Sequence, residues 1–419
     1  MSKAQSQQPF DPDTQALLEI GRSLGTTCNL DDLLQMVIEY SMRLLKADRA
    51  TLFLYDRNTE ELVSRIAEGT GELRIPANTG IAGTAAQSLT SVNVPDAYDD
   101  PRFNRSVDAQ TGYRTRNILA CPLTDYDGQL VGVLQVLNKK DGSFNDHDIA
   151  LAEAFSAQAG VAFQRSRLLE AFLEKRRLEE ALRLAQEIQQ RLLPREAPAV
   201  GGFDIACWNR PCDATGGDYC DFLRLDDHRV ALSFGDVSGH GVGPALVSCA
   251  TRAMLRALAS RHEAVNAVMD RVNNLMSQDL AENRFVTAFL GILDAQTAQM
   301  QYSSAGQGPL LWIDGQSGEC EVRGAQGVPV GILADFCYPH PDELDFRPGD
   351  LFVLFTDGFF EWARDDGEQF GIDRTVETIR NHRHQSSREV LHAVLRAVEQ
   401  FAGNRQTDDL TAIIIKRIA

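Results

Sequence analysis

The chain has 419 residues, with 41 Lys and Arg against 59 Asp and Glu, which gives a formal net charge of −18. This length exceeds what one hydrophobic core normally supports, so we expect at least two domains. The acidic balance argues against a general nucleic-acid binder and against adhesion to anionic lipid, because both require clustered Lys and Arg. A protein partner or a metal ion fits this charge better.

The sequence also argues against a membrane-spanning or secreted protein. Its apolar stretches fall short of the roughly 20 residues that cross a bilayer, and the polar N-terminus lacks the apolar core of a secretory signal. The eight cysteines form no Cys-x-x-Cys pair, so we expect reduced thiols and neither a disulfide scaffold nor a zinc site. We therefore expect a cytoplasmic protein that binds neither nucleic acid nor membrane.

The first segment, residues 13–165, mixes helical and strand patterns. Apolar residues recur at helical spacing from Leu17 to Leu45, and a last helix is expected to start near Asp146. Two hairpins are expected between these helices. They join residues 50–55 to 62–66 and residues 118–123 to 130–137. These patterns predict one α+β domain of about 150 residues.

Residues 166–195 form the next segment, which is rich in Glu, Arg, Leu and Gln and ends near Pro194. A seam with the 3-4-3-4 spacing of a coiled coil runs through it. The seam consists of Leu178, Ala181, Ala185, Ile188 and Leu192. Two interpretations stay open: a surface helix packed on either domain, or a dimer-forming signalling helix. The location between two domains favours the second, and with it a homodimer.

The third segment, residues 196–419, is richer in strands. Strand patterns lie at residues 219–225, 230–234, 286–293, 299–304, 310–313, 351–355 and 410–415. Helical patterns lie at residues 244–260, 264–280 and 388–401. This alternation predicts a β-sheet core, with two sheets flanked by helices.

Aspartates fall at the ends of these strands. Asp218 precedes one strand and Asp236 ends the next, with a turn around Asp227 between them. In an antiparallel hairpin centred on Asp227, positions 218 and 236 lie opposite each other at the open end.

A second pair of strands brings further carboxylates. Asp357 follows the strand at 351–355, and Asp408 and Asp409 precede the strand at 410–415. If these strands are antiparallel neighbours, their aspartates share an edge. Such a group would repel strongly without a cation, and its hard oxygen ligands suit Mg²⁺ or Mn²⁺ and not zinc.

Each of these pieces has a simpler interpretation. Asp357-Gly358 is a common turn dipeptide. Residues 235–243 could form a flexible loop or a phosphate cradle, but they lack the Gly-Lys-Ser/Thr ending of a nucleotide-binding loop. His240 could be a general acid, or it could be structural or merely exposed.

Four ordered motifs resemble a known family. They are Gly216 to Phe222 (GGDYCDF), Gly235 to Gly241 (GDVSGHG), Phe355 to Gly358 (FTDG) and Asp408 to Thr411 (DDLT). Their order and spacing are similar to the SpoIIE/RsbU-like branch of the metal-dependent protein phosphatases, in the protein phosphatase 2C superfamily. The segment from Gln186 to Pro194 also looks like the lead-in to these domains. The resemblance covers residues 196–419 and implies an α-β-β-α sandwich with a binuclear Mn²⁺ or Mg²⁺ centre that hydrolyses phosphoserine or phosphothreonine.

The resemblance implies roles for individual residues. Asp218, Asp236, Asp357 and Asp408 would be catalytic. The metal ligands would be Asp218, Asp236, Val237, Asp357, Asp408 and the adjacent Asp409. Asp236 would bridge both metals, and Val237 would contribute its backbone carbonyl through or beside a water. Gln307 departs from the histidine usual in this family, which puts a role for that side chain in doubt.

The first domain resembles a GAF domain, a small-molecule sensor fold. The matching residues are 79–83 (TGIAG), 93–98 (NVPDAY) and 100–103 (DPRF), followed by Asn138, Lys139, Phe144 and Asp148. The last four are similar to the Asn-Lys-Phe-Asp-Glu signature of cyclic-nucleotide-binding members, with Ile149 in place of Glu. They imply a site for a cyclic nucleotide or another small ligand. A ligand-free GAF domain used for dimerisation stays open.

We therefore expect a cytoplasmic signalling phosphatase regulated by its GAF domain. By resemblance, its substrate is a phosphoserine on a regulatory protein, of the STAS-type anti-sigma-factor antagonists. The alternative is a non-catalytic scaffold whose phosphatase fold has become a binding module. A nucleotide cyclase or kinase is disfavoured because the chain lacks a recognisable ATP loop.

Overall fold

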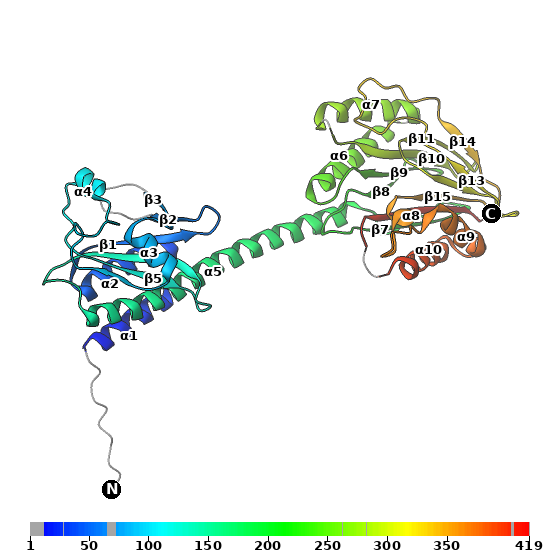
Figure 1. Ribbon diagram of the computed structural model, residues 1–419. Coiled ribbons are helices and arrows are strands. Elements are labelled where there is room, and N and C mark those ends of the chain that lie inside the picture. Colours follow the sequence, from blue (N-terminus) through cyan, green and yellow to red (C-terminus); the bar gives the residue numbers. More distant parts are fainter. Residues whose placement is uncertain are drawn as a thin grey trace, which may run out of the picture. The chain divides into compact units, whose positions relative to one another are not determined.

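The computed structural model describes residues 12–27, 29–64, 73–261, 263–281, 283–403 and 406–418. The chain divides into two compact units, Met1–Arg177 and Leu178–Ala419 (Figure 1). This division falls inside the segment expected to connect two domains. In the part of the chain described, no helix is both long enough and apolar enough to cross a bilayer.

A six-stranded antiparallel sheet forms the centre of the N-terminal unit, in the order β3-β2-β1-β6-β5-β4. Its strands are β1 (Ala47–Asp56), β2 (Glu61–Ser64), β3 (Leu73–Pro76), β4 (Val92–Val94), β5 (Ile118–Thr124) and β6 (Leu130–Lys139). Both predicted hairpins are confirmed, since β1 pairs with β2 and β5 with β6. Residues 65 and 66, expected to extend the second strand, lie outside the described residues.

Helices cover both faces of this sheet. They are α1 (Pro12–Thr26), α2 (Leu30–Leu45), α3 (Gly80–Ser88), α4 (Arg105–Thr111) and α5 (Asp146–Leu192). Residues of α1, α2 and the first turns of α5 share one core with the sheet, and α3 contributes to the core on the opposite face. The sequence did not predict α3, because its short run of Gly and Ala lacks an apolar period.

Helix α5 is a single helix of 47 residues. The sequence predicted a last helix of the first domain and a separate connecting helix over residues 166–195, and the structure joins the two in one uninterrupted helix. Leu178 and Ile188 of the predicted seam are 62% and 54% exposed in the single chain.

The C-terminal unit contains two five-stranded antiparallel sheets, in the orders β14-β11-β10-β9-β8 and β13-β12-β15-β16-β7. The strands of the first sheet are β8 (Tyr219–Arg224), β9 (Arg229–Val237), β10 (Val286–Asp294), β11 (Gln299–Ala305) and β14 (Asp342–Asp345). Those of the second are β7 (Phe203–Arg210), β12 (Leu310–Ile313), β13 (Cys320–Arg323), β15 (Leu351–Phe355) and β16 (Leu410–Arg417).

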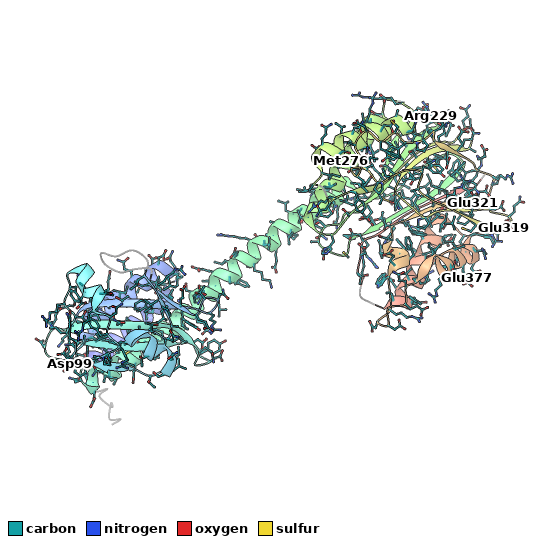
Figure 2. All side chains as sticks on the ribbon, turned by 45° about the horizontal axis from the view of Figure 1, so that its top comes forward. Asp99, Arg229, Met276, Glu319, Glu321 and Glu377 are labelled. Carbon is teal, nitrogen blue, oxygen red and sulfur yellow. A yellow bond between two sulfur atoms is a disulfide. The ribbon has the colours of Figure 1, made fainter. Side chains whose placement is uncertain are left out.

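The two sheets pack face to face and each carries helices on its outer side (Figure 1). The layer on the first sheet is α6 (Val242–Ala259) and α7 (Val265–Asp279), and that on the second is α8 (Gly358–Glu361), α9 (Gly371–His382) and α10 (Ser387–Ala402). Met276 of α7, labelled in Figure 2, belongs to the buried core that α6 and α7 form with the first sheet. Phe234, Phe289 and Phe352 belong to the core between the sheets. The α-β-β-α sandwich is therefore confirmed.

Strand β7 was not predicted, and it corrects our expectation about the cysteines. Cys207 of β7 and Cys220 of β8 form a disulfide, so the prediction that all eight thiols are reduced is wrong for this pair. The two strands belong to different sheets, and both cysteines belong to the core between them. Sequence spacing cannot reveal this proximity, because it arises from the packing of two sheets.

Candidate metal centre

The β8–β9 hairpin has the register predicted from its sequence. Tyr219 lies opposite Gly235. Asp226 stabilises the turn, because its Oδ1 accepts the backbone N–H of His228 at 2.9 Å and that of Arg229 at 2.8 Å. Arg229, which begins β9 at this turn, is labelled in Figure 2. The register places positions 218 and 236 opposite each other at the open end of the hairpin.

The second pair of strands also pairs as expected. β15 and β16 are antiparallel neighbours, with Phe355 opposite Ala412. Asp357 follows β15, and Asp408 and Asp409 precede β16, so the three lie at one edge of the second sheet.

Hydrogen bonds connect this edge to the first sheet. Thr356 Oγ1 donates to Asp218 Oδ2 at 2.8 Å, and the Thr411 hydroxyl also hydrogen-bonds the Asp218 carboxylate. The Asp218 and Asp236 side chains lie close enough to influence each other's pKa. The aspartates predicted from two separate strand pairs are thus brought together at one end of the two sheets.

Asp409 holds the loop that precedes β8. Its Oδ1 accepts the backbone N–H of Cys212 and its Oδ2 that of Gly217, both at 2.7 Å. The loop approaches so closely that a Cβ at Gly216 would lie 2.4 Å from Asp409 Oδ2, and one at Gly217 would lie 2.8 Å from the Val237 carbonyl oxygen. Glycine is therefore required at both positions. A role for Asp409 as a metal ligand stays a prediction, since both its carboxylate oxygens already accept hydrogen bonds.

Burial and mutual repulsion raise the pKa values of the first two carboxyl groups. The pKa of Asp218 is raised well above its usual range, first by burial and then by the charges of Asp236 and Asp409. Burial raises the pKa of Asp236 to about 7, and the charges of Asp357 and Asp408 add to this effect, while the hydrogen bond to Asp218 opposes it.

The pKa values of Asp357 and Asp408, at the edge of the second sheet, are raised as well. Burial, followed by the charge of Asp408, raises the pKa of Asp357 to about 6. The pKa of Asp408 is also raised by burial, and the backbone N–H of Asp409 and nearby His240 partly oppose the shift. A bound divalent cation would favour the charged form of each carboxylate and so lower these pKa values.

The donor atoms fit a hard cation by their chemistry. The carboxylates and the Val237 carbonyl are oxygen ligands, the type that Mg²⁺ and Mn²⁺ prefer. Within the described ranges, however, no group of three or more His, Cys, Asp or Glu side chains is already arranged to hold a metal ion. The centre fits a divalent cation by the chemistry and charge of its ligands.

His240 and Gln307 differ in their exposure to solvent. His240 is exposed, and its Nδ1 lies 2.8 Å from Asp213 Oδ2. Gln307 is buried and ties the two sheets together, because its Oε1 accepts from Thr287 Oγ1 at 2.8 Å and its Nε2 donates to the Phe355 carbonyl at 3.3 Å. Gln307 therefore braces the sandwich. The general-acid hypothesis for His240 stays a prediction.

Three residues beside the carboxylates were missed by the sequence reasoning. Thr356 and Thr411 lie inside the matched motifs FTDG and DDLT, and their place beside those aspartates was the only available signal. Gln189, near the end of α5, exchanges two hydrogen bonds with the backbone of Gly216, at 2.6 and 3.1 Å. It belongs to the segment that resembles the lead-in to the phosphatase domain, but the spacing gave no reason to single it out.

In the N-terminal unit, the predicted ligand-binding residues act as braces. Lys139 forms an ion pair with Asp148, and Asp148 also accepts the Asn145 backbone N–H at 2.8 Å. Asn138 donates to Tyr113 Oη at 2.8 Å. The fourth residue, Phe144, is buried in the core.

A cavity of about 510 Å³ lies elsewhere in this unit. Its lining includes Arg49, Arg102 and Tyr113, and the Arg49 guanidinium lies 4.0 Å from the centroid of the Tyr113 ring. None of the four residues predicted to bind a ligand lines this cavity. Their placement supports a structural role, and their direct contact with a ligand stays untested.

Comparison with known proteins agrees with this architecture. Residues 226–418 match the family Stage II sporulation protein E (SpoIIE), and residues 29–163 match the GAF domain. The chain therefore joins a GAF domain to a SpoIIE-type phosphatase domain. Asp236, Asp357, Asp408 and Asp409 lie inside the SpoIIE match, and Asp218 lies just before it.

Solved structures resemble the SpoIIE domain. The SiaA-PP2C domain of Pseudomonas aeruginosa is 26% identical with a TM-score of 0.51, over 59% of this chain and 99% of that one. The RsbU and RsbW domains of a Mycobacterium tuberculosis protein are 24% identical with a TM-score of 0.48, over 54% and 63%. The first likeness agrees with a PP2C fold for this domain.

Curated relatives share a smaller part of their length. A probable 3′,5′-cyclic phosphodiesterase of Caenorhabditis elegans is 34% identical over 187 residues, which are 41% of this chain and 25% of that protein. A cGMP-specific 3′,5′-cyclic phosphodiesterase of Drosophila ananassae is 29% identical over 236 residues, 48% of this chain and 20% of that protein. The chain thus spans a quarter or less of these relatives, and their names describe those proteins alone.

Proposed function

We propose that the protein is a metal-dependent phosphatase that hydrolyses phosphoserine or phosphothreonine on a regulatory protein. The observation that carries this proposal is the convergence of Asp218, Asp236, Asp357 and Asp408 at one end of the two sheets. The pKa of each is raised by burial, and neighbouring carboxylates add to the shift. Such a group is costly to maintain unless a cation offsets its charge.

Each residue of the proposed metal centre would have a separate role. Bound Mn²⁺ or Mg²⁺ would activate water near neutral pH and offset charge on the phosphoryl oxygens. Asp236, central among the carboxylates, would hold both ions, with Asp357, Asp408 and the Val237 carbonyl completing the set. Thr356 orients Asp218 by donating to its carboxylate.

The substrate and the setting are also proposals. The four motifs resemble the SpoIIE/RsbU-like branch, which supports a phosphoserine on a STAS-type anti-sigma-factor antagonist as substrate. The exposed seam of α5, with Leu178 and Ile188, supports a homodimer formed through this helix. We place this activity in the cytoplasm, under the control of the GAF domain.

The GAF cavity supports binding of a small ligand. Its volume of about 510 Å³ suits a nucleotide-sized molecule. The relatives named as cGMP-specific phosphodiesterases make cyclic nucleotides the first candidates. Calorimetric titration of the chain with cGMP and with cAMP tests this proposal. We expect a heat of binding with at least one of the two nucleotides. If neither gives a heat of binding, both are excluded as ligands.

The activity is tested by phosphate release from a phosphoserine STAS protein and from p-nitrophenyl phosphate, with Mn²⁺, with Mg²⁺ and with EDTA. We expect release that requires the metal, and a decrease of about 100-fold or more for Asp236→Asn. The matched control is Asp227→Asn, an exposed aspartate at the turn of the same hairpin, which should retain activity. Unchanged release by Asp236→Asn would contradict the mechanism.

A non-catalytic binding module is the second candidate. The observation in its favour is that no metal-holding group of side chains is preformed among the described residues. A binding module predicts capture of the phosphorylated protein without phosphate release, with or without Mn²⁺. The same assay therefore separates the two functions.

A further inference from the structure

The last turns of α5 contact the loop that carries Asp218. Gln189 Nε2 donates to the Gly216 carbonyl at 2.6 Å, and the Gly216 N–H donates to Gln189 Oε1 at 3.1 Å. The Gln189 side chain is only 7% exposed. The side-chain amide of Gln189 thus pairs with both the backbone N–H and the backbone C=O of the buried Gly216. A neighbouring β-strand would pair with a residue in the same way.

The same loop is held on its other side by Asp409. Asp409 Oδ2 accepts the Gly217 N–H at 2.7 Å, and Asp218 is the next residue. Two consecutive glycines give this loop more backbone freedom than any other residue pair would. Gln189 and Asp409 therefore both hydrogen-bond the backbone of this loop just before β8, with Asp409 as the acceptor from Gly217.

Leu193 gives the end of this helix a second attachment, because it lies one turn beyond Gln189 and packs against the core that includes residues of α6 and α7. The neighbouring Gln190 is exposed, so the helix offers one buried and one exposed glutamine side by side. Replacing Gln189 removes the pairing with Gly216 and leaves the Leu193 contact in place.

We propose that Gln189 is a positioning residue for the metal centre. It holds Gly216 so that Asp218 faces Asp236, and it thereby makes the affinity for metal depend on the end of α5. This inference rests on the proposed function, because it concerns the regulation of the same site. Loss of helical structure around Gln189 would leave the Gly216 N–H and carbonyl without their partner, which is costly for buried backbone groups.

The test compares Gln189→Met with Gln190→Met in the full chain. Methionine keeps the size and helix propensity of glutamine but cannot make the paired hydrogen bonds. We expect Gln189→Met to weaken Mn²⁺ binding about tenfold by calorimetry, which equals ~1.4 kcal/mol. We also expect faster hydrogen exchange of the Gly216 amide in the metal-free protein. Gln190→Met should match the wild type in both measurements.

Gln189→Glu is the second variant, for use if the methionine variant fails to fold. It retains an acceptor for the Gly216 N–H but loses the donor to the Gly216 carbonyl, so we expect binding weaker than wild type and a Gly216 amide that stays protected. Mn²⁺ affinity within twofold of wild type in the folded variants, or unchanged Gly216 exchange in Gln189→Met, would overturn the proposal. If the wild type itself binds no Mn²⁺, the proposed function fails, and the exchange measurement still decides whether Gln189 holds the loop.

Discussion

The two groups of polar residues that the sequence singled out, one in each unit, differ in how their charges are balanced. In the GAF domain, Lys139 and Asp148 neutralise each other in an ion pair, and both side chains are largely buried. In the SpoIIE domain, the buried Asp218 and the partly buried Asp236 lie among further carboxylates, and the pKa of each is raised. The first group is complete without a ligand, whereas the second carries charge that the protein leaves unbalanced.

This difference separates a structural motif from a binding site. A buried charge that has its own partner indicates that the motif stabilises the fold. Buried like charges without a cationic partner indicate a group that awaits a cation. Substitutions in the two groups should therefore have opposite effects on stability.

The largest effect is expected for Asp148→Asn. It leaves the Lys139 ammonium buried without its partner, which should lower the free energy of unfolding by about 3–5 kcal/mol. The matched control is Asp146→Asn, an exposed aspartate in the same first turn of α5. Urea unfolding of both variants measures the difference, and equal stability of the two would show that the ion pair is not structural.

Asp236→Asn should instead raise the free energy of unfolding of the metal-free protein. The pKa of Asp236 is raised to about 7 in the folded chain and is about 3.9 in an unfolded one. The folded state therefore binds the proton more tightly, and stability is lost as pH rises from about 4 to about 7. At pH 8 in EDTA, Asp236→Asn should be more stable than wild type by on the order of 2–4 kcal/mol, with little difference at pH 4.

Urea unfolding at the two pH values checks this prediction. Asp227→Asn serves again as the control from the same hairpin and should change stability little at either pH. If metal-free Asp236→Asn is less stable than wild type at pH 8, the negative charge of the carboxylates is already offset by other groups of the protein.

Added metal should offset the repulsion between the carboxylates and so stabilise the folded protein. This stabilisation should be larger at higher pH. The carboxylates must lose their protons before they bind an ion, and the pKa values of Asp236 and Asp357 are raised to about 7 and about 6. Mg²⁺ at 100 times its Kd should stabilise the chain by about 2.7 kcal/mol. Because Kd falls as the protons leave, a fixed Mg²⁺ concentration should raise Tm more at pH 8 than at pH 6. The same shift at both values would argue against these carboxylates as ligands.

The smallest effect is expected for Thr356→Val. The substitution keeps the side-chain shape but removes the hydrogen bond to Asp218 Oδ2 and the acceptor of the Thr411 backbone N–H, which together should cost about 1–2 kcal/mol of stability. The pKa of Asp218 should rise further, because this hydrogen bond favours the charged carboxylate. Metal binding should then shift to higher pH in a calorimetric pH series, and an unchanged series would show that Thr356 is not a second support for Asp218.

What could be predicted from the sequence was mainly local. The register that places Asp218 opposite Asp236 follows from a short turn and two alternating strands, so counting from Asp227 was sufficient. The four motifs also identified the fold, since their order reflects the strands that carry them. Helix α5 was predicted as two segments, divided near residue 165, because the composition changes there to one rich in Glu, Arg, Leu and Gln.

Contacts between distant elements could not be predicted. Thr356 and Asp218 are 138 residues apart, and Cys207 and Cys220 meet only because two sheets pack together. The sequence likewise could not show that Lys139 and Asp148 lie away from the GAF cavity, since a motif names residues without giving the direction of their side chains.

The central claim is that the acidic residues at the end of the two sheets form a metal centre. Calorimetric titration of the metal-free chain with Mn²⁺, compared with Asp236→Asn, tests it most directly. The account predicts two ions bound per chain in the wild type and loss of that binding in Asp236→Asn, with Asp227→Asn unchanged. Absence of Mn²⁺ binding to the folded wild type, or equal binding by Asp236→Asn, would contradict it.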